Sequence, residues 1–219
     1  MPGPLDGVKV VDFTEIIAGP LAGRLLADLG ADVIKVEPPW GEPWRLTQRF
    51  TPTESRTFMT YNRGKRSLPV NLTKDGAAEI INRLVTEMDI ALVNFRPDVA
   101  VKLGVDFETL STINPRLIYC ELTAYGREGP DAGRPGYDMI VQAMTGMVAS
   151  ETKTLEGVPS WVWSSPLIDT SAGICMAWSV CAALYARERT GVGQKIETSL
   201  LASALSLMGA RFLHVESLD

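Results

Sequence analysis

One carboxylate stands where the sequence could place a reactive group. Asp169 lies in P-L-I-D-T-S-A-G, between an apolar segment that suits a buried strand and a run over residues 170–189 that predicts a long helix. A carboxylate at such a corner can accept the unpaired N–H groups of the first helical turn. The local pattern favours a helix cap, which contributes about 1 kcal/mol, and a catalytic carboxylate is the alternative.

Chemistry based on histidine, cysteine or a metal has little support. His214 is the only histidine, and no G-x-S-x-G motif presents a serine to it. Cys120, Cys175 and Cys181 form no C-x-x-C pair, and we expect them to be free thiols in a reducing cytoplasm. A catalytic zinc site needs more ligands than this spacing supplies, so we expect no metal.

Basic residues gather in three clusters, each next to the end of a predicted strand. A charge run is most often a solvated face, but several such runs at one sheet edge also suit a phosphate-bearing ligand. These residues are Arg45, Arg49, Arg63, Lys65, Arg66, Arg96 and Lys102. Asn94 and Phe95 close one of the strands, and Phe95 suits either contact with an adenine or pantetheine group or a place in the core.

Strands and helices alternate along the chain. We expect strands over residues 8–13, 32–36, 67–72, 90–94, 117–123 and 194–198, with helices over 20–29, 74–88, 99–103, 107–113, 137–149, 170–189 and 199–213. Residues 38–56 hold four prolines and predict a functional loop. The pattern predicts an α/β fold: a doubly wound, mostly parallel Rossmann-like sheet with helices on both faces, in one domain over residues 1–219.

Composition limits the partners. The chain has 219 residues, 46% of them hydrophobic, and a net charge of −5, which argues against a broad nucleic-acid surface. We find no uninterrupted apolar run of the length a membrane span needs and no signal peptide, so we expect a cytoplasmic protein without a membrane partner.

A nicotinamide-dependent oxidoreductase is one alternative for such a fold. Glu37 ends the second predicted strand, where dinucleotide-binding folds place an acid for the ribose. The turn after the first strand reads T-E-I-I-A-G-P-L-A-G, however, which is not G-x-G-x-x-G. This alternative therefore rests on Glu37 alone.

A series of ordered motifs resembles the class III CoA-transferase family. They are L-D-G-V-K-V-V-D-F-T with A-G-P over residues 5–20, L-G-A-D-V-I-K-V-E-P-P (29–39), N-R-G-K-R-S (62–67), V-N-F-R-P (93–97), N-P-R-L-I-Y-C (114–120), A-Y-G with G-P (124–130), R-P-G-Y-D (134–138) and T-G-V-G-Q-K-I-E-T-S-L (190–200). The resemblance covers essentially the whole chain. It implies the CoA-binding large domain of an enzyme that transfers coenzyme A from an acyl-CoA donor to a carboxylic acid, with no cofactor besides coenzyme A as substrate.

The resemblance gives Asp169 a catalytic role. It implies that this carboxylate attacks the acyl-CoA thioester and that the reaction proceeds through aspartyl-anhydride and aspartyl-CoA thioester intermediates. A helix N-terminus would keep such a carboxylate ionised and therefore nucleophilic near neutral pH. The cap and the nucleophile are compatible roles for one side chain.

The same resemblance implies which residues surround the substrates. Tyr137, Asp138 and Ile17 match positions beside the acyl group, and the positions that match coenzyme A contacts are Ile16, Ala18, Val70, Asn71, Leu72, Asn94, Phe95 and Lys102. Relatives that racemise α-methylacyl-CoA have a histidine where Tyr137 stands. Tyrosine, with a pKa near 10, is a poor base for an α-proton, so a transferase is favoured and a racemase is the alternative.

Family members are longer than this chain. In them the N-terminal part leads into a smaller domain before the chain returns to the large one, and two copies form an interlocked homodimer. We therefore expect either the N-terminal part of a longer transferase, without the small domain and the return segment, or a truncated, non-catalytic CoA-binding homologue.

Overall fold

A six-stranded parallel sheet forms the centre of the computed structural model, which describes residues 2–47, 49–52, 55–150, 154–155, 158–159 and 165–212. The strand order is β3-β2-β1-β4-β5-β8, and every neighbouring pair is parallel. The strands are β1 (Lys9–Asp12), β2 (Asp32–Glu37), β3 (Arg66–Pro69), β4 (Ile90–Val93), β5 (Ile118–Thr123) and β8 (Gln194–Ser199). This order is that of a doubly wound sheet, so the predicted fold class is confirmed.

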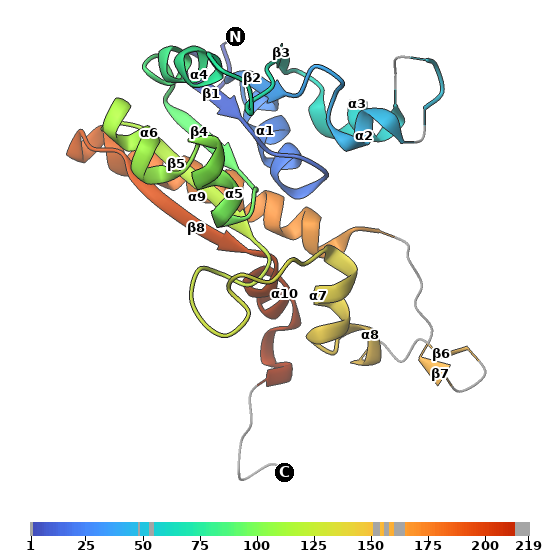
Figure 1. Cartoon of the computed structure of the whole chain (residues 1–219). Coiled ribbons are helices and arrows are strands. Elements are labelled where there is room, and N and C mark those ends of the chain that lie inside the picture. The colour runs from blue at the N-terminus through green and yellow to red at the C-terminus, as the bar shows by residue number, and fades with distance from the viewer. Residues whose placement is uncertain are drawn as a thin grey trace.

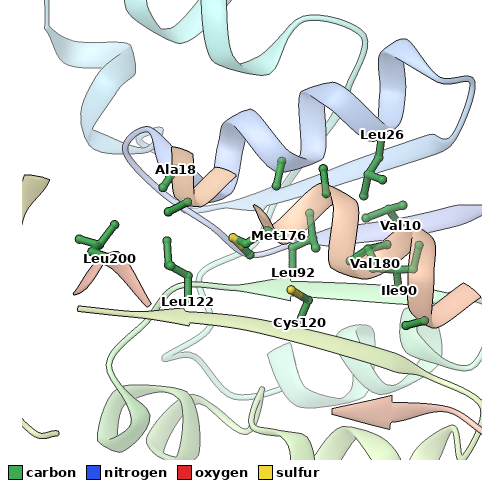
Figure 2. Packing of buried hydrophobic residues seen from close by; sticks show 14 of the residues in the cluster. Val10, Ala18, Leu26, Ile90, Leu92, Cys120, Leu122, Met176, Val180 and Leu200 are labelled. Carbon is green, nitrogen blue, oxygen red and sulfur yellow. The ribbon is translucent and has the colours of Figure 1, made fainter. Parts of the chain in front are cut away.

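Helices cover both faces of the sheet (Figure 1). On one face lie α1 (Ala18–Asp28) and α9 (Leu167–Thr190), and on the other lie α4 (Ala77–Val85), α5 (Pro97–Leu103) and α6 (Phe107–Ile113). Side chains alternate between the faces, as in Ile90 and Leu92 against α1 and α9 but Ala91 and Val93 against α4 to α6. Figure 2 shows the first of these cores, in which Leu26 of α1 and Met176 and Val180 of α9 meet the strands. Since both faces are covered, the central strand β4 is apolar and buried along its whole length, whereas the edge strands β3 and β8 carry polar residues.

The long helix α9 has apolar residues on all its sides. Ile168, Ala172 and Met176 are fully buried, whereas Ile174 and Trp178 are exposed. By length and mean hydropathy this helix could cross a membrane. The sequence pattern did not predict this, because Thr170, Ser171 and Ser179 interrupt the apolar run. In this fold α9 packs against α1 and the sheet.

Some predicted elements differ from the structure. The loop predicted over residues 38–56 contains α2 (Pro43–Leu46) and leads into α3 (Arg56–Asn62). The helix predicted over 137–149 is two helices, α7 (Asp138–Met144) and α8 (Met147–Ser150), because Gly146 between them has a φ of 73°. The last predicted helix is α10 (Leu200–Met208) followed by the 3₁₀ helix η1 (Gly209–Phe212). A small hairpin pairs β6 (Thr154–Leu155) with β7 (Val158–Pro159).

The apolar segment before Asp169, which suits a buried strand, lies partly outside the described residues, which omit 161–164. In its described part Leu167 and Ile168 already belong to α9, so the helix begins before Asp169.

The order of the strands determines where a ligand can bind. β1 and β4 are neighbours, but the chain leaves β1 toward β2 and leaves β4 toward β5, on the opposite side. The connections after these two strands therefore separate, and a crevice opens at their carboxyl ends.

Candidate active site

A pocket of about 340 Å³ lies at the carboxyl ends of β1, β4 and β5. Its walls come from the segments that follow these strands and from the segment before α7. The lining residues are 15–18, 94–97, 122–124 and 132–137, together with Val99, Asp169 and Leu200. The pocket is therefore in the crevice where the two halves of the sheet separate.

Asp169 is the third residue of α9, and its side chain is half-buried in the pocket wall. Gly173, one helical turn further on, lies on the same face and packs on the start of α1. A Cβ atom at Gly173 would stand 2.6 Å from the carbonyl oxygen of Ala18. The close packing that glycine permits here brings Asp169 beside Ile17 and Ala18.

The prediction that Asp169 caps its helix is wrong, and the surroundings of its side chain disfavour the ionised form. The N-cap residue of α9 is Pro166, whose side chain cannot accept a hydrogen bond, and the first-turn N–H of Asp169 is accepted by Asp138 instead. Burial, together with the neighbouring charge of Asp138, raises the pKa of Asp169 to about 7. The favourable effect of an acid in the first helical turn is smaller than these two effects. Among the described residues no group donates a hydrogen bond to the Asp169 carboxylate, so its oxygens are free to react.

Asp138 contacts the backbone of Asp169 directly. Its Oδ2 atom accepts the N–H of Asp169 at 2.9 Å, and its Oδ1 atom accepts a hydrogen bond from Gln142. Asp138 is buried, whereas Tyr137 before it is 64% exposed and lines the pocket. The pair predicted beside the acyl group is therefore divided, with Tyr137 facing the pocket and Asp138 supporting the start of α9.

The segment after β1 provides Ile16, Ile17 and Ala18 to the pocket. The Asn94 side chain holds this segment, because its Oδ1 accepts the N–H of Glu15 at 2.9 Å and its Nδ2 donates to the Glu15 carbonyl at 2.8 Å. Phe95 both lines the pocket and packs on the core beneath the sheet. The structure thus gathers these predicted residues around one cavity.

Four predicted contacts lie elsewhere. Val70, Asn71 and Leu72 follow β3, which is separated from β4 by β2 and β1, and they do not line the pocket. The N–H of Val70 already donates to the Glu37 carbonyl at 2.8 Å. Lys102 is exposed on α5, also outside the pocket wall. Contact of these residues with coenzyme A stays a prediction.

The basic clusters do not gather around the pocket, and their contact with a phosphate stays a prediction. Most of these side chains are paired with acids. Arg45 pairs with Glu37, 8 residues away, whereas Arg63 with Asp28, Lys65 with Asp12 and Arg66 with Asp32 are pairs 34 to 53 residues apart. Of the clusters only Arg96 lines the pocket, and its partner Asp98 is exposed. Sequence spacing shows where a charge lies along the chain, but it does not show its partner.

Sequence reasoning missed two charged residues of the pocket wall, Glu15 and Arg134. Arg134 comes from the glycine- and proline-rich loop before α7 and forms an exposed ion pair with Asp131. Glu15 follows β1 directly, so the rule that ligands meet the carboxyl ends of parallel strands could have found it. No comparable signal marks Arg134. Among the residues that the structure describes, no group of three His, Cys, Asp or Glu side chains could hold a metal ion.

Comparison with known proteins gives one consistent result. The model of CoA-transferase family III matches residues 5–217. The chain is 41% identical over 207 residues to an acetyl-CoA:oxalate CoA-transferase of Acetobacter aceti, and it covers 53% of that protein. It is 42% identical over 213 residues to Rv3272 of Mycobacterium tuberculosis, a probable fatty acyl-CoA transferase, and covers 54% of it. These matches include 94% and 96% of the present chain.

Solved structures agree with the sequence matches. The chain superposes on the crystal structure of Rv3272 with a TM-score of 0.88 at 42% identity, covering 94% of this chain and 58% of that one. A CAIB/BAIF family protein from Brucella suis gives a TM-score of 0.87 at 37% identity, with 95% and 56% covered. The chain spans about half the length of the curated relatives that it matches.

Proposed function

The chain belongs to CoA-transferase family III, and on that premise we propose that it provides the nucleophile and the CoA-binding half of an enzyme that transfers coenzyme A from an acyl-CoA to a carboxylic acid. The observation that carries the proposal is the Asp169 carboxylate, which lines a pocket at the switch point of the sheet and has no hydrogen-bond donor among the described residues. Relatives are named for such transfers, between acetyl-CoA and oxalate and between succinyl-CoA and glutarate.

The chemistry would proceed in two exchanges at Asp169. An Asp169 oxygen attacks the thioester carbonyl, the C–S bond breaks, and an aspartyl–acyl anhydride and CoA thiolate form. The thiolate attacks the aspartyl carbonyl, which releases the donor acid and leaves an aspartyl-CoA thioester. The acceptor carboxylate then displaces the thiolate from that thioester, and the thiolate attacks the acceptor's acyl carbon. Asp169 and a new acyl-CoA result, with no net gain or loss of protons.

The walls of the pocket suit the parts of such a substrate. Ile16, Ile17 and Phe95 offer apolar surface for a pantetheine chain, and Arg96 and Arg134 offer guanidinium groups for its phosphates. Both arginines are half exposed in their present ion pairs, which are weak in water and easily exchanged for a phosphate. The backbone N–H groups at the start of α1 have no side-chain cap and are candidates to stabilise the thioester oxyanion.

The test is to trap the intermediate. The protein is incubated with acetyl-CoA and either hydroxylamine or borohydride, and the modified residue is located by mass spectrometry. We expect modification at Asp169, and we expect Asp169→Ala to lose at least about a thousandfold in transfer rate, because it removes the nucleophile. Glu79→Gln, on an exposed position of α4, is the matched control and should keep its activity.

Two outcomes would contradict the proposal in different ways. If Asp169→Ala keeps most of its transfer activity, Asp169 is not the nucleophile. If calorimetry shows tight binding of free coenzyme A but the wild-type protein forms neither intermediate nor product, the chain is a non-catalytic CoA-binding homologue.

We also propose that the full-length protein pairs as an interlocked homodimer, as the resemblance implies. The outer face of α9 supports this proposal, because Ile174, Trp178 and Tyr185 are 53%, 71% and 66% exposed on one side of the helix. A helix that is apolar on all sides is usually covered on all sides. Sedimentation velocity of the full-length protein should give twice the monomer mass. A single monomeric species would contradict the proposed homodimer.

A further inference from the structure

Ile16 has an unusual backbone conformation in the pocket wall. Its φ is 74°, and it is the one non-glycine residue with a positive φ in the part of the chain that the structure describes. A β-branched side chain is especially unfavourable in this region, because Cβ crowds the backbone. Such a conformation persists only where the surroundings hold it, and it is often found at functional sites. Ile16 directly precedes Ile17 and Ala18, which face the pocket with Asp169.

Two side chains from other parts of the fold hold this segment. Glu42 Oε2 accepts the N–H of Ile16 at 3.2 Å. Asn94 holds the preceding residue, Glu15, with the two hydrogen bonds described above. Glu42 is fully buried, and its second oxygen, Oε1, has no hydrogen-bond partner among the described residues. Burying a carboxylate oxygen without a hydrogen-bond partner costs free energy. An apolar side chain would fill this space in the core at lower cost, so the contact with Ile16 needs another explanation.

Contacts within the loop after β2 hold Glu42 beside Ile16. The Glu37 carboxylate, at the end of β2, accepts two hydrogen bonds from the Arg45 guanidinium at 2.6 and 2.7 Å and one from Ser67 at 2.6 Å. It also accepts the N–H of Glu42 at 3.4 Å. The Arg45 guanidinium stacks on the Phe58 ring at 3.5 Å. These contacts fold residues 38–46 back over the end of the sheet, with Glu42 against Ile16.

We propose that Glu42 is a positioning residue for the transfer reaction. Its carboxylate keeps Ile16 in the left-handed conformation and thereby sets the direction of the backbone at Ile17 and Ala18, which begins α1 beside Asp169. Glu42 does not touch the substrates in this role. The inference rests on the proposed function for its kinetic part, whereas the geometry that it describes can be tested without turnover.

The decisive experiment is a double-mutant cycle between positions 42 and 16. Glu42→Ala in the wild-type background should lower kcat at least tenfold with a smaller change in KM, since Asp169 remains but the backbone beside it is misdirected. Glu42→Gln keeps an acceptor oxygen and should stay within about threefold of wild type. Glycine adopts a positive φ without steric cost, so position 16 no longer needs Glu42 to hold it in the Ile16→Gly background. Adding Glu42→Ala to Ile16→Gly should therefore lower kcat by less than about threefold.

A matched control separates positioning from stability. Asp106 is another buried carboxylate that accepts a backbone N–H, that of Thr109 at 3.0 Å, and it does not line the pocket. Asp106→Ala should lose stability while the folded protein keeps its kcat. If Glu42→Ala behaves like Asp106→Ala, or if its effect on kcat is the same in the wild-type and in the Ile16→Gly background, the proposal is overturned.

Amide hydrogen exchange decides the geometric part without any reaction. The N–H groups of Ile16 and Ile17 should exchange at least tenfold faster in Glu42→Ala than in wild type, while amides of β4 are unchanged. Unchanged exchange at Ile16 would overturn the proposal even in an active enzyme. If wild type shows no transfer, the proposed function fails, but the exchange result still decides whether Glu42 holds Ile16.

Discussion

Two carboxylates that lie against α1 have opposite electrostatic environments. Asp12, at the end of β1, is fully buried, and its Oδ2 atom is 2.7 Å from the Nζ of Lys65. Burial opposes its ionisation, but the charges of Lys65 and Lys35 and the hydrogen bonds from Lys65 and Thr14 together outweigh burial and lower the pKa of Asp12. Asp169 is only half-buried, yet burial and the charge of Asp138 raise its pKa to about 7.

The difference shows what makes a carboxylate structural or reactive. The lone pairs of Asp12 are used by Lys65, by the N–H of Thr14 at 2.9 Å and by the Thr14 hydroxyl. The oxygens of Asp169 accept no hydrogen bond from the described residues, and the nearest charge repels them. A carboxylate with satisfied oxygens is stable and unreactive, while one held at high free energy in a pocket is ready to form a covalent bond.

The largest effect should come from removing the structural carboxylate. Asp12→Ala removes the ion-pair partner of the buried Lys65, and we expect a loss of about 3–5 kcal/mol in the free energy of unfolding. Urea unfolding followed by circular dichroism measures it. In the control, Asp28→Ala removes the exposed partner of Arg63 and should cost less than about 1 kcal/mol. Equal losses in the two variants would contradict the structural role of Asp12.

Removing the reactive carboxylate of Asp169 should raise the free energy of unfolding, whereas removing that of Asp12 lowers it. Asparagine cannot ionise, so Asp169→Asn should be more stable than wild type at pH 8, by about 1–3 kcal/mol. The folded-state pKa of Asp169, about 7, lies above its ordinary value of 3.8, so between these values the folded wild type binds the proton more tightly than the unfolded chain. The advantage of asparagine should therefore shrink as the pH falls from 7 toward 4. Unfolding curves at pH 5, 6, 7 and 8 test this, and a difference independent of pH would contradict it.

Much of the fold and part of the site follow from local patterns. Apolar strands alternating with amphipathic helices predict the parallel sheet, and residues directly after strands, such as Asn94, Phe95 and Ile16, are expected together at its carboxyl edge. The structure gathers them with Asp169 around one pocket. Position along the chain was sufficient to predict that these residues lie together, because a parallel sheet places the carboxyl ends of its strands at one edge.

The ionisation of Asp169 could not be predicted in this way. It depends on Asp138, which is 31 residues away, and on how deeply α9 sits behind α1. For the same reason Lys65 looked like a phosphate ligand, although Asp12, 53 residues away, already binds it. Pairing between distant charges has no sequence period, so it becomes visible only when the fold is known.

The smallest and most specific test changes Asp138 alone. Asp138→Asn keeps an oxygen that can accept the N–H of Asp169, but it removes the negative charge that disfavours ionisation there. The pKa of Asp169 should fall from about 7 by on the order of one unit, and kcat/KM should begin to level off at a correspondingly lower pH. Carboxyl carbon NMR of the labelled aspartates measures the pKa without turnover, and Asp75→Asn, in an exposed turn, is the control. An unchanged pKa would mean that burial alone raises the pKa of Asp169. The difference between Asp169 and Asp12 would then come only from the lysine that pairs with Asp12.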